Sequence, residues 1–276
     1  MDSTWSILTF FVSCFAGFLG SLLGLGGGII VIPFLTLVLH IDIRHAIGAS
    51  LISVIATSSG AAVAYLRERI TNIRIAMFLE IATTLGALTG AFVNSLLRTN
   101  ILYLLFGLLL LYSAIKIFQG RKQELPEGVK SSPLARKLRL PSSYYDQVLH
   151  REVKYEVTGV GQGFFTLYLA GIVSGLLGLG AGVFKVLAMD TFMRLPMKVS
   201  TTTSNFMIGV TAAASAGYYL TNGLVDPVIA GPVALGVLLG AMIGTRVLFQ
   251  TKNTTIRLLF FLILLFISIR MIIKGL

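Results

Sequence analysis

The sequence predicts an all-α polytopic membrane protein made of two inverted repeats, each with about five helical segments. Its composition is the first reason: hydrophobic residues make up 55% of the 276 residues and charged residues 12%, too apolar a mixture for a soluble domain of this length. The second reason is that the apolar runs are long and continuous, without the alternation of a β-barrel. The third is an internal duplication. We therefore expect a multi-pass protein of the cell (cytoplasmic) membrane, surrounded by the lipid bilayer.

The duplication relates residues 16–118 to residues 170–272 at a constant offset of 154, without a gap. "AGFLGSLLGLGGG" of the first copy aligns with "AGIVSGLLGLGAG" of the second, and "GALTG" aligns with "GAMIG". The expected regions are a first transmembrane repeat at 1–118, a linker loop at 119–159 and a second transmembrane repeat at 160–276.

Each copy has the same series of five apolar segments. In the first copy they are about 5–23, 28–39, 46–66, 73–96 and 101–118, and in the second about 162–177, 182–193, 199–220, 227–249 and 255–273. The second segment of each copy is short, since twelve helical residues cover about 18 Å of a hydrocarbon layer roughly 30 Å thick. We expect it to be a broken or re-entrant half-helix that ends near the membrane midplane.

The distribution of basic residues predicts the orientation in the membrane. The linker is polar and holds eight basic residues against five acidic ones, so the positive-inside rule places it in the cytoplasm. Because the short segment and its predecessor enter and return, each copy changes sides an odd number of times. The two copies are then inverted relative to each other, with both termini outside.

Glycines interrupt the chain just before each short segment. We expect a first helix to break there and a short helix to begin again, with its N-terminal N–H groups and partial positive charge aimed at the protein centre. Such an end suits an anion. The expected binding backbone is Gly26, Gly27 and Gly28 in the first copy and Gly180, Ala181 and Gly182 in the second. The alternative is close helix packing by small residues, which we favour for "GALTG" and "GAMIG".

Lys185 lies at the start of the second short helix, where the first copy has Val31. A lysine at this depth cannot easily reach water, so we expect it to bind the anion. The alternative is a structural ion pair with Glu80, a residue that is also a candidate for proton coupling.

The third segments open with polar runs, "HAIGASLISV" and "KVSTTTSNFM", which bring three candidate anion ligands to matching levels: Ser50, Ser204 and Asn205. The alternative is that these side chains bond to carbonyl groups of their own helices.

Other functional classes find little support. There is no HExxH motif, nucleophile elbow or histidine within a span, so we expect no enzyme activity. The single Cys14 excludes a cysteine-based metal site, and we expect no metal and no cofactor. Membrane topology explains the net charge of +11 better than a nucleic-acid partner does. An anion transporter is the main hypothesis; an anion channel is its nearest rival, and the oligomeric state stays open.

The duplicated glycine motif, followed by "RHAIGASL" in the first copy and "MKVSTTTSNF" in the second, resembles the TauE/SafE family of sulfite and organosulfonate exporters. The resemblance covers nearly all of the chain except the linker. In the second copy Ser200, Thr202 and Thr203 stand where the first has Ala46, Gly48 and Ala49. The resemblance implies movement of a small sulfur-containing or carboxylated anion across the cytoplasmic membrane, usually outward. Sulfite, sulfoacetate or another organosulfonate are the expected substrates, with thiosulfate or a small carboxylate as alternatives.

Overall fold

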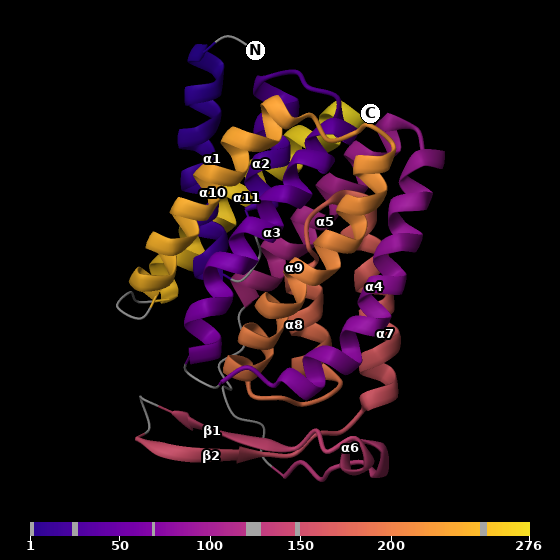
Figure 1. Ribbon diagram of the computed structural model, residues 1–276, viewed down its shortest axis with the longest axis vertical. Helices are drawn as coiled ribbons and strands as arrows, with labels where there is room; N and C mark the ends of the chain where they lie inside the picture. Colours follow the sequence, from indigo (N-terminus) through magenta and orange to yellow (C-terminus); the bar gives the residue numbers. More distant parts are fainter. Residues whose placement is uncertain (1–2, 24–26, 68–69, 120–127, 147–149, 249–252) are drawn as a thin grey trace.

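The computed structural model describes residues 3–23, 27–67, 70–119, 128–146, 150–248 and 253–276, which are mostly helical (Figure 1). The first copy contains α1 (Ser3–Leu23), α2 (Gly28–Pro33), the π-helix η1 (Phe34–Val38), α3 (Ile43–Arg67), α4 (Ile73–Leu96) and α5 (Thr99–Gln119). The second contains α7 (Val160–Leu177), α8 (Gly182–Thr191), α9 (Met197–Thr221), α10 (Pro227–Leu248) and α11 (Asn253–Gly275). The expected apolar segments and the observed helices therefore begin and end within a few residues of each other.

Three helices of the described chain are long and apolar enough to cross a membrane, judged by length and composition: Ile73–Leu96, Val160–Leu177 and Pro227–Gly244. On α4 the exposed side chains form an apolar stripe at helical spacing, which is the face expected to meet lipid: Met77, Ile81, Leu85, Leu88 and Phe92. In contrast, α8 has ten residues and is about 15 Å long, so it cannot cross the bilayer alone.

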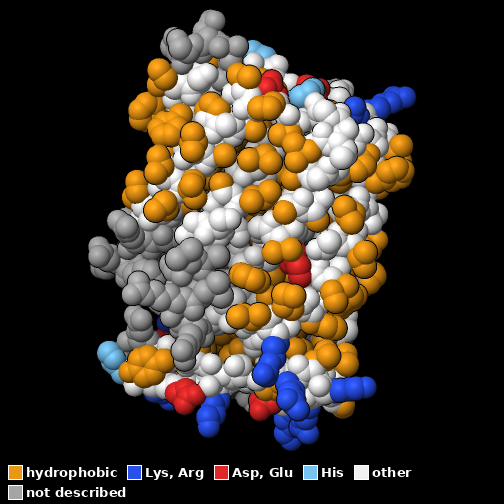
Figure 2. Space-filling view, in the orientation of Figure 1, with side chains coloured by type: hydrophobic (Ala, Val, Ile, Leu, Met, Phe, Trp, Pro, Cys, Tyr) orange, Lys and Arg blue, Asp and Glu red, His pale blue; other side chains and the backbone are white. Residues whose placement is uncertain are grey.

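The two ends of the molecule differ in charge and in the segments of the chain that they carry. Lys and Arg side chains gather at the end that carries the linker, while apolar side chains cover the middle of the surface (Figure 2). The first helix, α1, begins and the last helix, α11, ends at the opposite end of the molecule from the linker (Figure 1). By contrast, α7, the equivalent of α1, begins at the linker end.

Equivalent helices of the two copies make equivalent contacts. The first helix of each copy packs on the fourth helix of the other, so α1 contacts α10 and α7 contacts α4. Glycines of "GALTG" and "GAMIG" permit these contacts: a Cβ on Gly86 would overlap the Tyr168 carbonyl, and a Cβ on Gly240 would overlap the equivalent Cys14 carbonyl. The close-packing interpretation of these two motifs is therefore confirmed.

Replacing Gly240 by valine should prevent α1 and α10 from packing. A Cβ on Gly240 would lie 2.8 Å from both the carbonyl carbon of Cys14 and the backbone nitrogen of Phe18. Both are backbone atoms of α1, so they cannot move away without displacing that helix. We expect Gly240→Val to lower the melting temperature of the detergent-solubilised protein or to abolish its monodisperse gel-filtration peak. Gly231→Val on the same helix is the matched control, because nothing lies within 4 Å of that Cβ. Equal stability of the two variants would contradict this account of the interface.

The linker, predicted as a loop, contains secondary structure. It contains a short helix, α6 (Pro133–Lys137), and two antiparallel strands, β1 (Ser142–Asp146) and β2 (Arg151–Tyr155), with Ser142 opposite Tyr155. Ser132 caps α6, because its hydroxyl accepts a hydrogen bond from the Ala135 amide, 3.3 Å away. Five-residue strands with one alternating apolar face are too short a pattern to stand out in a charged loop.

Asn72 joins the linker to the helices. Its side-chain amide donates to the Leu140 carbonyl at 2.9 Å and to the Tyr155 hydroxyl at 2.8 Å, while its carbonyl oxygen caps α4 by accepting from the Ile75 amide. Burial raises the pKa of the Tyr155 phenol, so this acceptor stays protonated at neutral pH. The backbone N–H of Asn72 also donates to the Thr203 hydroxyl on α9 at 3.2 Å. The linker is thus fixed to the helices that carry the candidate site.

Candidate functional site

The break between α7 and α8 is a tight backbone turn. Gly178 (φ +66°), Gly180 (φ +68°) and Ala181 (φ +49°) all have left-handed backbone conformations. Glycine adopts such angles without strain, whereas a residue with a Cβ does so rarely. The helix α7 ends at Leu177 and α8 begins at Gly182, so the expected break in the second copy is confirmed.

Side chains from three other helices satisfy the carbonyl groups at the end of α7. Tyr219 on α9 donates to the Gly175 carbonyl at 3.0 Å. Asn94 on α4 donates to the Leu176 carbonyl at 2.7 Å, and Ser50 on α3 donates to the Gly178 carbonyl at 2.8 Å. Buried carbonyls at a helix end need such donors, since no water reaches them.

The start of α2 in the first copy meets the break of the second copy at Ser50. Gly28, the first residue of α2, lies so close to Ser50 that an added Cβ would overlap the Ser50 hydroxyl and lie 3.0 Å from the Gly178 carbonyl oxygen. Gly27 is buried and precedes α2 with an ordinary helical φ of −68°. Gly26, the remaining candidate in this motif, lies outside the described residues.

Two apolar side chains lie beside Gly180. An added Cβ there would lie 2.6 Å from a Cγ of Ile208 and 2.9 Å from a Cγ of Val54. These two residues occupy equivalent positions in the two copies, on α9 and α3. The candidate backbone site is therefore closely packed in this conformation.

The polar candidates on α9 differ from each other. The Ser204 hydroxyl donates to the carbonyl of Gly182, the first residue of α8, at 3.2 Å. The backbone carbonyl of Asn205 accepts a hydrogen bond from the Ser58 hydroxyl at 2.6 Å. The Asn205 side-chain nitrogen is buried and has no hydrogen-bond acceptor among the described residues. Asn205 thus keeps a donor available to a ligand, whereas Ser204 is engaged.

Lys185 and Glu80 share one hydroxyl group. Lys185 is 0% exposed, and its ammonium group donates to the Thr211 hydroxyl. The same hydroxyl donates to Glu80 Oε1 at 2.6 Å, and Thr84 donates to that oxygen at 3.2 Å. Lysine and glutamate from α8 and α4 are therefore linked through a threonine of α9.

The charged residues lie on α8 and α4, and the equivalent helices α2 and α10 have apolar residues at the same positions. At the equivalent position Lys185 is replaced by Val31, and Glu80 by Ala234, whereas Thr211 is matched by Thr57. The charges are therefore present together or absent together, as a balanced pair requires, because an unpaired buried charge is expensive.

Three residues of this region were not predicted from the sequence: Asn94, Thr211 and Tyr219. Each had a signal. Asn94 is an amide within an apolar span, and both Thr57 with Thr211 and Tyr65 with Tyr219 are identical pairs in the two copies.

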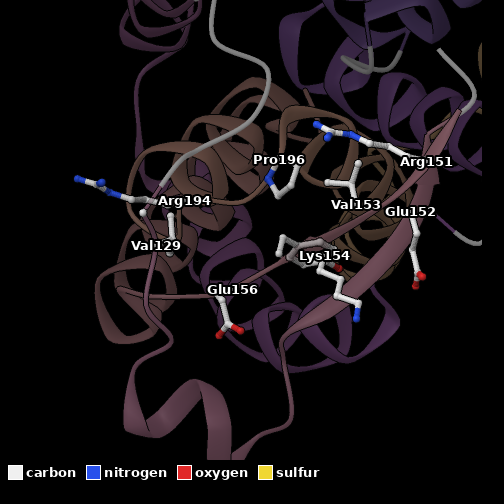
Figure 3. A pocket seen from close by; sticks show the side chains of 10 residues that line it. Val129, Arg151, Glu152, Val153, Lys154, Glu156, Arg194 and Pro196 are labelled. Atoms are coloured by element: carbon white, nitrogen blue, oxygen red, sulfur yellow. The ribbon is translucent and has the colours of Figure 1, made fainter. Parts of the chain in front are cut away.

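A hollow of about 430 Å³ lies between the linker and the loop after α8. Its charged lining residues come from β2 and its flanks and from the α8–α9 loop: Arg151, Glu152, Lys154, Glu156 and Arg194. Their side chains point in different directions rather than toward one point (Figure 3). This hollow therefore lacks the converging groups of a ligand site.

Comparison with known proteins identifies the family. The model of the family described as sulfite exporter TauE/SafE matches residues 9–271. The chain is 26% identical over 267 residues to the probable membrane transporter protein YunE of Bacillus subtilis (strain 168), covering 94% of each chain. It is also 26% identical to the probable membrane transporter protein YdhB of the same organism, covering 87% of each. A probable membrane transporter protein of Xylella fastidiosa (strain 9a5c) is 28% identical, over 83% of this chain and 79% of the relative.

No solved structure matches the chain significantly. A family match over nearly the whole length, relatives that are membrane transporters, and helices apolar enough to span a bilayer agree with one another. The chain is a multi-pass membrane transporter, not an enzyme, and it belongs to the sulfite exporter TauE/SafE family.

Proposed function

We propose that this protein is a secondary transporter that exports a small anion, such as sulfite, sulfoacetate or another organosulfonate, across the cytoplasmic membrane. One observation carries the proposal: the start of α2 meets the break between α7 and α8 at Ser50, and Lys185 is the fourth residue of α8. A helix start offers unpaired N–H groups and a partial positive charge. One lysine adds a full charge.

The anion would lie between Gly26 to Gly28 and Gly180 to Gly182, with Lys185, Asn205, Ser50 and Ser204 replacing its water. Ser50 and Ser204 already donate to carbonyls, so they would have to exchange those partners for the anion. Val54 and Ile208 contact the same break, and their separation would open the site. Such opening and closing about a fixed site is how inverted repeats achieve alternating access.

Flux measurements across a panel of anions test this function. We expect proteoliposomes with the purified protein to show saturable uptake and counterflow of sulfite, sulfoacetate or both. Thiosulfate and small carboxylates serve as competitors in the same assay, and their transport would support the alternative substrate class. Flux that rises linearly with concentration and shows no counterflow would instead support an anion channel.

The proposed orientation has the linker in the cytoplasm, both termini outside and the two copies inverted. Two single cysteines in a Cys14→Ser background test it, at exposed positions on the linker and at the C-terminus: Lys154→Cys and Leu276→Cys. We expect a membrane-impermeant maleimide to label the C-terminal cysteine in intact cells, and the linker cysteine only after permeabilisation. Labelling of both from the same side would contradict the inverted arrangement.

A further inference from the structure

Glu80 has one carboxylate oxygen with partners and one without. Oε1 accepts hydrogen bonds from Thr211 and Thr84, at 2.6 and 3.2 Å. Oε2 is buried and has no hydrogen-bond partner among the described residues. A buried carboxylate oxygen without a donor is costly while it carries charge, and a proton on that oxygen removes the cost.

The charge count of the site changes when an anion binds. With the anion absent, Lys185 and Glu80 balance each other through Thr211. A singly charged anion held by Lys185 would leave the buried site with one excess negative charge, and a doubly charged anion such as sulfoacetate would leave it with two. A proton on Glu80 removes one negative charge, because it makes Glu80 neutral and leaves the charge of Lys185 to balance the anion.

Other titratable groups on the surrounding helices are few. On α8 they are Lys185 itself and Asp190, and Asp190 interacts with another group. Tyr168 on α7 has its hydroxyl 3.4 Å from Thr89, more than two turns of α4 beyond Glu80. On α9, Lys198 pairs with Asp146 of the linker at 2.9 Å, and the Tyr219 hydroxyl donates to the Gly175 carbonyl. Within the described residues, Glu80 is thus the acidic group joined to the ammonium of Lys185.

We propose that Glu80 is a proton-binding site of the transport cycle and that one proton crosses the membrane with each anion. This inference rests on the proposed anion site. The proton comes from water on the side where the anion enters, binds Oε2 of Glu80, and leaves to water on the other side with the anion. Thr211 links the two events, since its hydroxyl contacts both the glutamate and the lysine. The direction of net flux then follows the combined gradients of anion and proton.

Simultaneous measurement of anion and proton flux tests the inference. Proteoliposomes are loaded with the pH indicator pyranine, and labelled sulfoacetate is added outside. Its carboxyl and sulfonate groups stay ionised above about pH 6, so the probe itself carries no proton. We expect the wild type to acidify the interior by about one proton per sulfoacetate, because Glu80 can bind one proton. An acidic exterior should accelerate uptake.

Glu80→Gln separates coupling from transport. Glutamine keeps the shape and an acceptor oxygen for Thr211 but cannot bind the proton. We expect this variant to exchange sulfoacetate for sulfoacetate at a rate independent of pH, without proton movement. Its melting temperature should rise more with added sulfoacetate than that of the wild type, because the anion then pairs with an otherwise unbalanced Lys185. Thr89→Val, which removes a hydroxyl of the same helix that bonds the Leu85 carbonyl and not Glu80, should retain proton coupling.

The possible outcomes are distinct. Sulfoacetate uptake by the wild type without proton movement overturns the inference and leaves the proposed function intact, and this holds even when Glu80→Gln does not fold. Proton-coupled uptake by Glu80→Gln also overturns it. Absence of any anion flux in the wild type, across the whole panel, is instead a failure of the proposed function.

Discussion

Lys185→Met is expected to abolish anion binding and to destabilise the fold at the same time. Methionine fills nearly the same volume as lysine, so the variant tests the charge without leaving a cavity. Loss of the ammonium leaves Glu80 without its counter-charge, so the protein must either keep that charge buried, which costs about 3–5 kcal/mol when a buried pair loses one member, or bind a proton at Glu80. The measurements are the melting temperature of the purified protein and its shift with added sulfite or sulfoacetate.

A second substitution separates the two effects. In Lys185→Met with Glu80→Gln, no buried charge remains unbalanced, so we expect the melting temperature to recover while the shift with anion stays absent. Lys198→Met is the matched control, because it removes a half-exposed lysine paired with Asp146 and should leave anion binding unchanged. Anion binding by the doubly substituted protein would show that Lys185 is a structural ion-pair partner and not an anion ligand.

Gly180→Val is expected to abolish transport while the protein still inserts and folds. The backbone at Gly180 has a φ of +68°, which a β-branched residue adopts only with strain. Its side chain would also collide with Ile208 and Val54, at the point where the two copies must separate. Together, backbone strain and overpacking cost about 2–5 kcal/mol. Gly180→Ala meets the same first contacts with a smaller side chain and should reduce flux only in part.

Gly223→Val is a control that isolates backbone strain. Gly223 has the same φ of +68°, but no atom lies within 4 Å of an added Cβ. We expect it to lower stability slightly and to leave flux and anion binding close to those of the wild type. If both valine variants lost flux equally, the close approach at Gly180 would have no special role.

The sequence by itself determined the membrane class, the duplication and the ends of the helices. Each of these features follows from local composition or from comparison of the chain with itself. None of them depends on how the helices pack in three dimensions. The length of the segment from Gly182 established that it cannot span the bilayer, and the break before it follows from the conformational freedom of Gly178 and Gly180. Lys185 stood out because a charge in an apolar run has few explanations.

Only the tertiary structure decided which residues meet. Glu80 and Lys185 are 105 positions apart in the sequence, and the hydroxyl that joins them belongs to a third helix. The donors to the end of α7 likewise come from α3, α4 and α9. No periodicity within one segment encodes such contacts, because they follow from how helices far apart in sequence pack through their glycines. A polar side chain in an apolar span shows that a partner exists, and packing decides which partner it is.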